Sequence, residues 1–426
     1  MPDAPKNPRP SAFLAVLLLV GAVLVWRAGK PPAPVESEPA TAPPAIRAVS
    51  ADATSGATAR SPESSAAPEE RHGPVKRDGL DAANLYADAF VLFNQLNDAE
   101  KAMIRKPSDE VDAEQAAKLF EKLQAIMALL RAAAKADYCD WGTGEITFET
   151  GLPHVTKAND LAQLALWAAG YRFSNDPAGA IDDLALRAKL GHHLSDTLVG
   201  ALLAASIERG ANGLLQQYAG SMDATTLHAA TSFIGGSTLD ADLTRAFRGE
   251  ISGVESYGAK LASADPLERG RMMRTLNAGA SGTSDWLEPV KEIATGLFAS
   301  PQRIAEEVSF IRGVHEEAPD AMRLPETEFQ SWWASVESAV QDVHPLAKLT
   351  LPSLSGVQAS IQRLRVERTL LTAAADVLQN GPARIGLYRD PATGGALIHV
   401  PTPSGFELRS PYVAKGKPVT MSFTRP

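Results

Sequence analysis

"LAQLALWAAGYRFSNDPAGAIDDLALRAKL", residues 161–190, is the stretch that decides the fold. Apolar residues recur every three or four positions on both sides of "SNDPAG", which is typical of two amphipathic helices joined by a turn. The packing positions of a tetratricopeptide repeat are occupied by Leu164, Trp167, Ala168, Tyr171, Ala180 and Leu184. Arg187 stands where that repeat has a small residue, and the following residues do not repeat the pattern. The stretch therefore predicts a helical hairpin that is only partly tetratricopeptide-like.

The helical pattern continues over most of residues 80–380. "DAANLYADAFVLF" and "DAEQAAKLFEKLQAIMALLRAAAKA" each place their apolar residues on one helical face. Further helices are expected at 155–173, 177–193, 195–217, 223–234, 239–261, 265–277, 299–313, 327–342 and 355–380. Helices joined by short turns pack as stacked hairpins or irregular bundles. We therefore predict a mainly α fold, with an irregular helical-hairpin domain over 80–380.

The tail, residues 383–426, has a different pattern. Short apolar runs, "ALIHV", "GFELR" and "VTMSF", alternate with turns that contain glycine and proline. This pattern predicts a small antiparallel β meander of about three strands. Because so few residues cannot hold a core alone, we expect the meander to pack on the helical domain. The apolar side chains expected to face the helices are Leu387, Leu397, Ile398 and Phe406.

The N-terminal region carries a membrane signal. After a short tail, residues 1–10, the stretch 11–27 contains the uncharged run "SAFLAVLLLVGAVLVW" at 11–26, with basic residues on both sides. At ~1.5 Å per residue this run spans roughly 24 Å, somewhat less than the hydrocarbon core of a bilayer. We therefore expect a transmembrane anchor or uncleaved signal at 11–27; a cleaved signal, which would release the protein, is the alternative.

Residues 31–78 form a linker in this interpretation. They are rich in Pro, Ala, Ser and Glu and contain few large apolar residues, so they cannot bury enough surface to offset the entropy of ordering. A disordered linker between an anchor and a folded domain favours a single-pass protein in the cell membrane, with its C-terminal domain extracytoplasmic. A cytoplasmic domain on the same flexible linker is the competing interpretation.

Composition excludes several classes of function. The formal net charge of −9 argues against a nucleic-acid-binding surface, which is normally basic. The single cysteine, Cys139, cannot form an intramolecular disulfide. No zinc-binding spacing, phosphate-binding loop, dinucleotide fingerprint or nucleophile elbow occurs in the sequence. We therefore expect no metal, no cofactor and no enzymatic activity.

One loop is dense enough in polar residues to raise the question of a site. "DYCDWGTGEITFETGLPH", residues 137–154, offers Asp140, Glu145, Glu149 and His154 as weak candidates. Carboxylates gathered on one loop can act as a general acid and a general base. However, carboxylates beside Cys139 raise the pKa of a thiol and so disfavour a nucleophilic role. The structural interpretation, a loop held in the core by its cysteine and tryptophan, explains more of these residues.

Three other features have ordinary structural explanations. Adjacent His192 and His193 point about 100° apart on a helix, so they do not readily share a metal, and they suit the C-terminal end of the helix dipole. Arg269, with Arg271 and Arg274, could contact an anionic surface, although a solvated helix face is the simpler interpretation. Trp332 and Trp333 cannot both face one core, so one of them could be exposed, and an interface there is the alternative to ordinary exposure.

Several segments together resemble a family of uncharacterised bacterial proteins of the planctomycete type, which have one N-terminal membrane segment. The resemblance rests on "AANLYADAFVLF", "NDAEK", "CDWG", "GLPH", "KANDLAQLALWAAGY" and "LYRDPATGGALIHVPTPSGFELRS". It implies membrane anchoring and a helical architecture, but it implies no activity. The tail also resembles the C-terminal end of type II secretion pseudopilins. The N-terminus does not fit that family, because its apolar segment lacks the acidic residue of the pilin motif.

Two functional hypotheses follow. The first is a membrane-anchored extracytoplasmic scaffold or binding module for an envelope component or protein partner. The second is an envelope hydrolase that uses the carboxylates of residues 137–154. A hydrolase requires a cleft in which titratable groups with perturbed pKa values converge, whereas a scaffold does not.

Overall fold

The computed structural model describes residues 79–136, 138–142, 152–265, 268–272, 300–343, 346–347, 351, 354–414 and 416–424. The predicted anchor at 11–27 and linker at 31–78 lie outside the described residues, as do Glu145, Glu149 and Arg274. None of the helices in the described ranges is both long and apolar enough to cross a bilayer.

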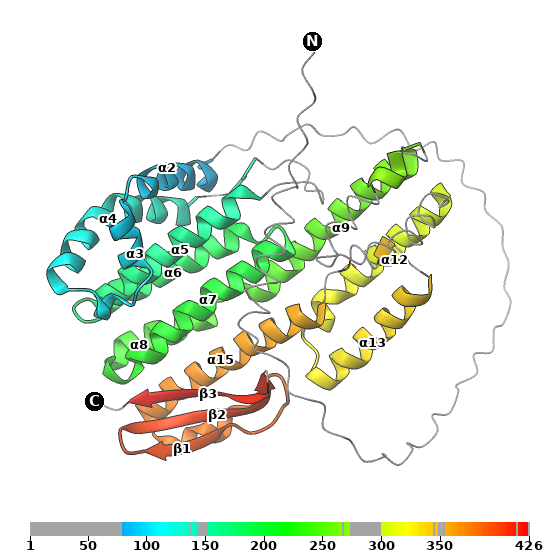
Figure 1. Cartoon of the computed structure of the whole chain (residues 1–426). Coiled ribbons are helices and arrows are strands. Elements are labelled where there is room, and N and C mark those ends of the chain that lie inside the picture. Colours follow the sequence, from blue (N-terminus) through cyan, green and yellow to red (C-terminus); the bar gives the residue numbers. More distant parts are fainter. Residues whose placement is uncertain are drawn as a thin grey trace, which may run out of the picture.

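The described chain is mostly helical and ends in a small sheet, as predicted (Figure 1). Its α-helices are α2 (Ala82–Asn94), α3 (Asp98–Ile104), α4 (Ala113–Ala134), α5 (Pro153–Arg172), α6 (Pro177–Leu194), α7 (Leu198–Tyr218), α8 (Ala224–Gly235), α9 (Leu239–Ser263), α12 (Pro301–Ala321), α13 (Glu326–Val343) and α15 (Leu354–Asn380). Short 3-10 helices are η1 (Ser108–Glu110), η2 (Ala219–Ser221) and η3 (Pro382–Leu387). The strands are β1 (Ile398–Thr402), β2 (Gly405–Ala414) and β3 (Lys417–Thr424).

The hairpin of residues 161–190 is formed by α5 and α6. Pro177 begins α6, and the side chain of Asp176 caps it by accepting a hydrogen bond from the backbone of Gly179. The two helices pack side by side in the middle of the bundle (Figure 1). The hairpin is thus confirmed, whereas its tetratricopeptide-like character remains a prediction.

Arg187 explains why this hairpin departs from the repeat pattern. Its side chain is buried, and it donates hydrogen bonds to the backbone carbonyls of Ala162 in α5 and Ile207 in α7. Gly210 leaves room for the guanidinium group, since a Cβ there would lie 2.6 Å from one of its nitrogens. Burial lowers the pKa of Arg187 to about 9. The arginine joins three helices where a repeat would place a small contact residue.

Ion pairs fasten α15 to the helices around it. Arg209 of α7 binds both carboxylate oxygens of Glu367, at 3.1 and 3.2 Å. Arg365 pairs with Asp240 at the start of α9, at 2.5 Å.

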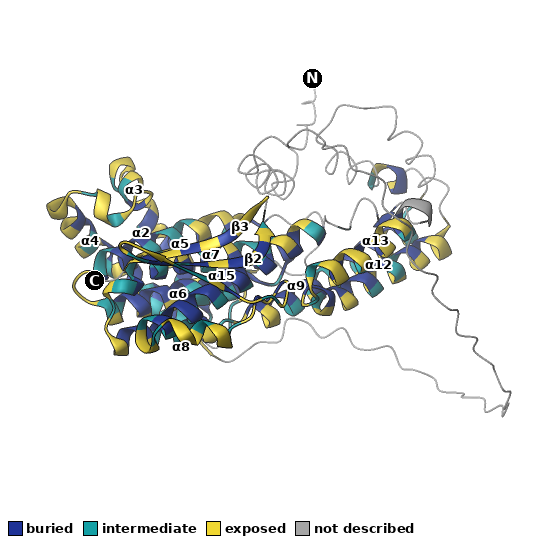
Figure 2. Cartoon of the chain, turned by 90° about the horizontal axis from the view of Figure 1, so that it is seen from below, coloured by how far each residue is buried: buried dark blue, intermediate teal, exposed yellow. Residues whose placement is uncertain are grey.

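Apolar residues of α9, α12, α13 and α15 form one core cluster, and residues of α2, α4 and α5 form another. Figure 2 shows buried residues running through the middle of the bundle and along the arm made by α9, α12 and α13.

The sheet has the order β1-β2-β3 with antiparallel neighbours, and it packs on α15 and α7. Alternate residues of β2 and β3 face the helices: Phe406, Leu408, Tyr412, Val419, Met421 and Phe423 are all buried. The side-chain amide of Gln216 in α7 also donates to the carbonyl of Ser422 in β3. The meander is therefore part of the folded body.

Two of the four side chains expected to face the helices do not. Leu397 and Phe406 are buried as predicted, but Ile398 is 52% exposed and Leu387 is 64% exposed. Ile398 pairs directly with exposed Arg409, so both residues lie on the outer face of the sheet. Leu387 ends η3, a helix with no buried residue.

Arg269 does not lie on a solvated helix face. It is buried and donates hydrogen bonds to the carbonyls of Leu261 and Ala264, at 2.8 and 2.9 Å. These carbonyls lie at the C-terminal end of α9 and have no continuing helix to bond to. The prediction was wrong for Arg269, whose long side chain folds back to cap the preceding helix, whereas Arg271 is exposed as predicted.

The two adjacent tryptophans of α13 diverge as expected. Trp333 is buried and donates to Glu337 at 2.7 Å, whereas Trp332 is only partly buried and donates to Glu317 of α12 at 3.0 Å. Both indole nitrogens thus have partners. An interface at Trp332 remains a prediction.

Candidate functional site

The described part of the 137–154 loop is held by backbone and side-chain hydrogen bonds. The backbone of Ala82 donates to the carbonyl of Tyr138, and the Asp81 carboxylate accepts from the backbone of Asp140 at 3.0 Å. Asp140 in turn accepts from the backbone of Gly142 at 2.9 Å, closing a turn in which Gly142 has a φ of 65°. Asp140 therefore acts as a turn-forming residue, which fits the structural interpretation of the loop.

Trp141 connects this loop to the end of α6. Its indole stacks on the rings of Tyr86 and His154, with centroid distances of 5.4 and 4.7 Å. Its N–H donates to the carbonyl of His193 at 2.8 Å, which caps one of the last carbonyls of α6. The half-buried tryptophan therefore stabilises the C-terminal end of α6.

The titratable groups of this loop are poorly suited to catalysis. Burial, followed by the charge of Asp81, raises the pKa of the Cys139 thiol to about 12. Burial lowers the pKa of His154 to about 4, so its imidazole is neutral at pH 7. Among the described residues, no hydrogen bond joins Asp140 to His154, and the other two candidates, Glu145 and Glu149, lie outside that part of the chain.

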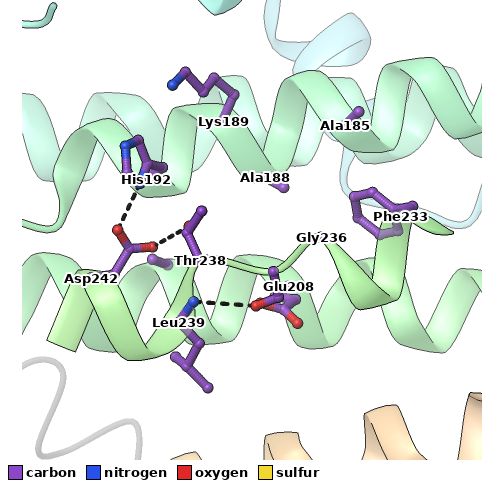
Figure 3. A pocket seen from close by; sticks show the side chains of 12 residues that line it. Ala185, Ala188, Lys189, His192, Glu208, Phe233, Gly236, Thr238, Leu239 and Asp242 are labelled. Carbon is purple, nitrogen blue, oxygen red and sulfur yellow. Dashed lines mark hydrogen bonds and ion pairs between the residues drawn. The ribbon is translucent and has the colours of Figure 1, made fainter. Parts of the chain in front are cut away.

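A cavity lined by several polar side chains lies on the other side of α6. There a cavity of about 270 Å³ opens between α6, α7, the end of α8 and the start of α9 (Figure 3). Small and apolar side chains make most of its wall: Ala185, Ala188, Ala204, Phe233 and Leu239. Polar side chains enter from α6, α7, the α8–α9 turn and α9: Lys189, His192, Glu208, Ser237, Thr238 and Asp242.

Helix packing positions these polar groups. Gly191 lets α6 approach α7 closely, since a Cβ there would lie 3.2 Å from Ala204. The next residue, His192, lies against Asp242 in the first turn of α9. The backbone of Leu239 donates to the hydroxyl of Ser237 at 3.3 Å, which fixes the entry into α9. The cavity therefore forms where two close-packed helices meet the α8–α9 turn.

An oriented imidazole is the central feature of the cavity. His192 Nδ1 lies 2.7 Å from one oxygen of Asp242, and Thr238 donates to the other oxygen at 2.7 Å. Arg245 donates to Asp242 at 2.8 Å and also bonds the carbonyl of His192. Because an ionised carboxylate only accepts hydrogen bonds, the network assigns a ring proton of His192 to Nδ1. The other ring nitrogen, Nε2, lies 3.4 Å from a nitrogen of Arg245, and because a guanidinium only donates, Nε2 is the acceptor of that long contact.

Glu208 is the second acidic group of the cavity. It accepts from the hydroxyl of Ser237 at 2.9 Å and pairs with Arg368 of α15 at 3.2 Å. Burial raises the pKa of Glu208, and the charge of Arg368 opposes this shift. Each carboxylate of the cavity thus has a hydroxyl donor and an arginine.

The neighbouring His193 serves a different environment. It is buried on the opposite side of α6, where its Nδ1 lies 2.9 Å from the hydroxyl of Tyr86. Burial, followed by the charge of Lys189, lowers its pKa to about 3. The two histidines diverge as predicted, but His193 is neutral and so does not bring a charge to the helix dipole. Across the described ranges, no three His, Cys, Asp or Glu residues are grouped as a metal site.

Comparison of the chain with protein-family models, curated proteins and solved structures finds no match. Function is therefore inferred from the geometry of the chain itself.

The sequence analysis singled out His192 but did not identify Asp242 and Glu208 as site residues. The acidic first turn of α9 was the only local signal for Asp242, and nothing local marked Glu208.

Proposed function

We propose that the protein is a single-pass, membrane-anchored binding module whose helical domain is extracytoplasmic. The support for the anchor is the uncharged run at 11–26 with its basic flanks, and the support for display away from the membrane is the Pro/Ala-rich linker at 31–78. The resemblance to anchored planctomycete-type proteins favours the same arrangement. The domain would bind an envelope component or a protein partner.

The observation that carries the binding role is the cavity at His192. Ligand sites in proteins are concave, mostly apolar, and contain a few polar groups held in fixed positions. The cavity has this composition, and its His192, Asp242 and Thr238 are fixed by hydrogen bonds of 2.7 Å. The partner would place one small group there. The partly tetratricopeptide-like hairpin of α5 and α6 supplies one wall and supports a module of the helical-repeat kind.

Acid–base chemistry in the same cavity is a second candidate. A carboxylate-oriented imidazole can act as a general base through its other nitrogen once the long contact of that nitrogen with Arg245 opens, and Glu208, with its raised pKa, could act as an acid. This arrangement favours a hydrolase here over one that uses Asp140, Glu145, Glu149 or His154. In the described loop, Asp140 and His154 are engaged in a turn and a ring stack.

Native mass spectrometry of the full chain, purified from membranes in a mild detergent, tests the binding role. Ala185 lies exposed at the rim of the cavity, so Ala185→Trp should fill its mouth without disturbing the core. Ala178→Trp is the matched control, because it is also exposed and lies two turns earlier on the same face of α6. We expect a small bound molecule in the wild type and the control that is absent from Ala185→Trp. The same bound molecule in all three proteins, or no bound molecule in any of them, would contradict the proposal.

A further inference from the structure

The two carboxylates of the cavity wall can accept further hydrogen bonds. Glu208 accepts from Ser237 at 2.9 Å through one oxygen and pairs with Arg368 at 3.2 Å through the other. Asp242 accepts from three side chains, but the oxygen that faces Thr238 has only that one bond among them. Because a carboxylate has about four acceptor sites, both groups keep capacity for a ligand, and Glu208 keeps more of it.

The side-chain donors of the same wall are already used. The hydroxyls of Ser237 and Thr238 and the Nδ1 of His192 all donate to the two carboxylates. Among the described residues, the ion-pair partners of these carboxylates are two arginines and His192, and not Lys189. Figure 3 shows the amino group of Lys189 turned away from both. A ligand group that brings donors and no acceptors therefore matches these side chains best.

Two negative charges share the cavity. Arg245 and Arg368 each pair with one of them, but neither arginine lines the cavity. Burial raises the pKa of Glu208; Arg368 opposes this shift, and the charge of Asp242 adds to it. The two carboxylates therefore repel each other. A cation in the cavity would reduce this repulsion and would not need to displace either arginine, since acceptor sites remain on both carboxylates.

We propose that the cavity binds a small organic cation, a protonated primary amine whose ammonium group donates to Glu208 and whose carbon body lies against the apolar wall. Phe233, Leu239 and three alanines supply that wall. The volume of about 270 Å³ accommodates a single ring with a short substituent. An ammonium group has three donors and no acceptor, as the wall requires. This inference rests on the proposed binding function and names the chemistry of its ligand.

Three molecules of similar shape separate the possibilities. Benzylamine is a cation at neutral pH, benzyl alcohol is a neutral donor, and benzoate is an anion. Their dissociation constants would be measured by ligand-observed NMR on the full chain in lipid nanodiscs, with Ala185→Trp to subtract binding outside the cavity and Ala178→Trp as its control. We expect benzylamine to bind at least about tenfold more tightly than the other two, because hydrogen bonds between charged groups are the strongest available.

Two variants test where the ammonium group binds. Glu208→Gln removes the charge and keeps the shape, so it should weaken benzylamine binding at least about tenfold. Glu255→Gln is the matched control, because it removes the same charge from the arm, where Glu255 pairs with Arg312, and it should change nothing. Lys189→Met keeps the aliphatic stem and removes a positive charge, so benzylamine should bind at least as tightly as before.

Several results would overturn the inference. Tightest binding of benzoate, lost in Lys189→Met, would make the cavity an anion site. Equal binding of benzylamine and benzyl alcohol would remove the role of charge, and unchanged binding of benzylamine in Glu208→Gln would remove the role of Glu208. If Glu208→Gln does not fold, weaker binding of benzylamine in Lys189→Met would still contradict a cation site.

Failure of this inference is distinguishable from failure of the proposed function. If none of the three molecules binds in a way that Ala185→Trp abolishes, the amine ligand is wrong. The native mass spectra then decide separately whether the cavity binds another molecule.

Discussion

Phe406→Ala should destabilise the whole folded body and not only the sheet. Phe406 has no exposed surface, and it stacks on Phe423 and His399 with centroid distances of 5.3 and 5.2 Å. It belongs to one apolar cluster with Leu215 of α7 and Leu370 of α15. Truncation of a fully buried phenylalanine removes its transfer free energy and leaves a cavity. We expect the free energy of unfolding to fall by about 3–5 kcal/mol.

Ile398→Ala is the matched control on the same sheet. Ile398 is 52% exposed and shares the outer face with Arg409, so its truncation should cost less than about 1 kcal/mol. The assay is urea unfolding of the full chain in detergent, followed by circular dichroism of the helices. Because the inner face of the sheet packs on α7 and α15, the helical signal should report the loss at Phe406.

Two results would refute this reasoning. One is a separate sheet transition with an unchanged helical transition, which would make residues 383–426 a detachable module. The other is an equal effect of Phe406→Ala and Ile398→Ala, which would mean that Phe406 is not packed as the structure shows. Deletion from Gly381 onward should expose the apolar faces of α7 and α15 and lower stability further.

Three further predictions follow from individual contacts. Trp141→Phe removes the indole N–H that caps the His193 carbonyl, and it should lower the melting temperature with a loss of about 1 kcal/mol, whereas Trp332→Phe, at a more exposed indole bonded to Glu317, should have less effect. Burial lowers the pKa of His315 from 6.5 to about 4, so its stabilising contribution is complete above pH 6.5 and is lost as the pH falls towards 4. This loss, about 3 kcal/mol, should disappear from the pH dependence of urea unfolding in His315→Leu. Finally, if residues 11–26 form an uncleaved anchor, the chain should stay with membranes after an alkaline wash and release its domain when external protease cuts within 31–78; a mature chain that begins after Trp26 would contradict the anchor.

The fold was largely predictable because helix faces repeat locally along the chain. The expected helix at 155–173 is α5, Pro153–Arg172, and the expected helix at 239–261 is α9, Leu239–Ser263. The expected helix at 299–313 proved longer, since α12 continues to Ala321 through Pro319. Buried Ala318, Ala321 and Met322 hold that last turn by tertiary packing, which local sequence does not reveal.

Strand faces and side-chain caps were less predictable. The parity of β1 depends on its pairing with β2, so the sequence alone could not place Ile398 opposite Arg409. Trp141 caps α6, whose last carbonyls lie 52 residues further along the chain, and Arg269 folds back onto the helix that precedes it. Such contacts depend on where chain segments meet in space.

The candidate site was also hard to predict, because its residues meet only in the folded chain. The predicted loop concentrates Cys139, Asp140 and His154 within a short stretch, yet the described part of it is a structural connection. The cavity instead joins His192, Glu208 and Asp242 from three helices. The close contact of Gly191 with Ala204 brings α6 and α7 together beside the cavity, and in the sequence it is marked only by two small residues.

Amide hydrogen exchange tests the central claim, that the helical domain binds its ligand in the cavity at His192. The full chain would be compared before and after addition of the small-molecule fraction of a membrane extract. We predict slower exchange in peptides that cover 185–192, 204–208 and 233–242, and no such change in Ala185→Trp. Slower exchange confined to 138–154, to α13 or to the sheet, or no change in any peptide of the wild type, would contradict the claim.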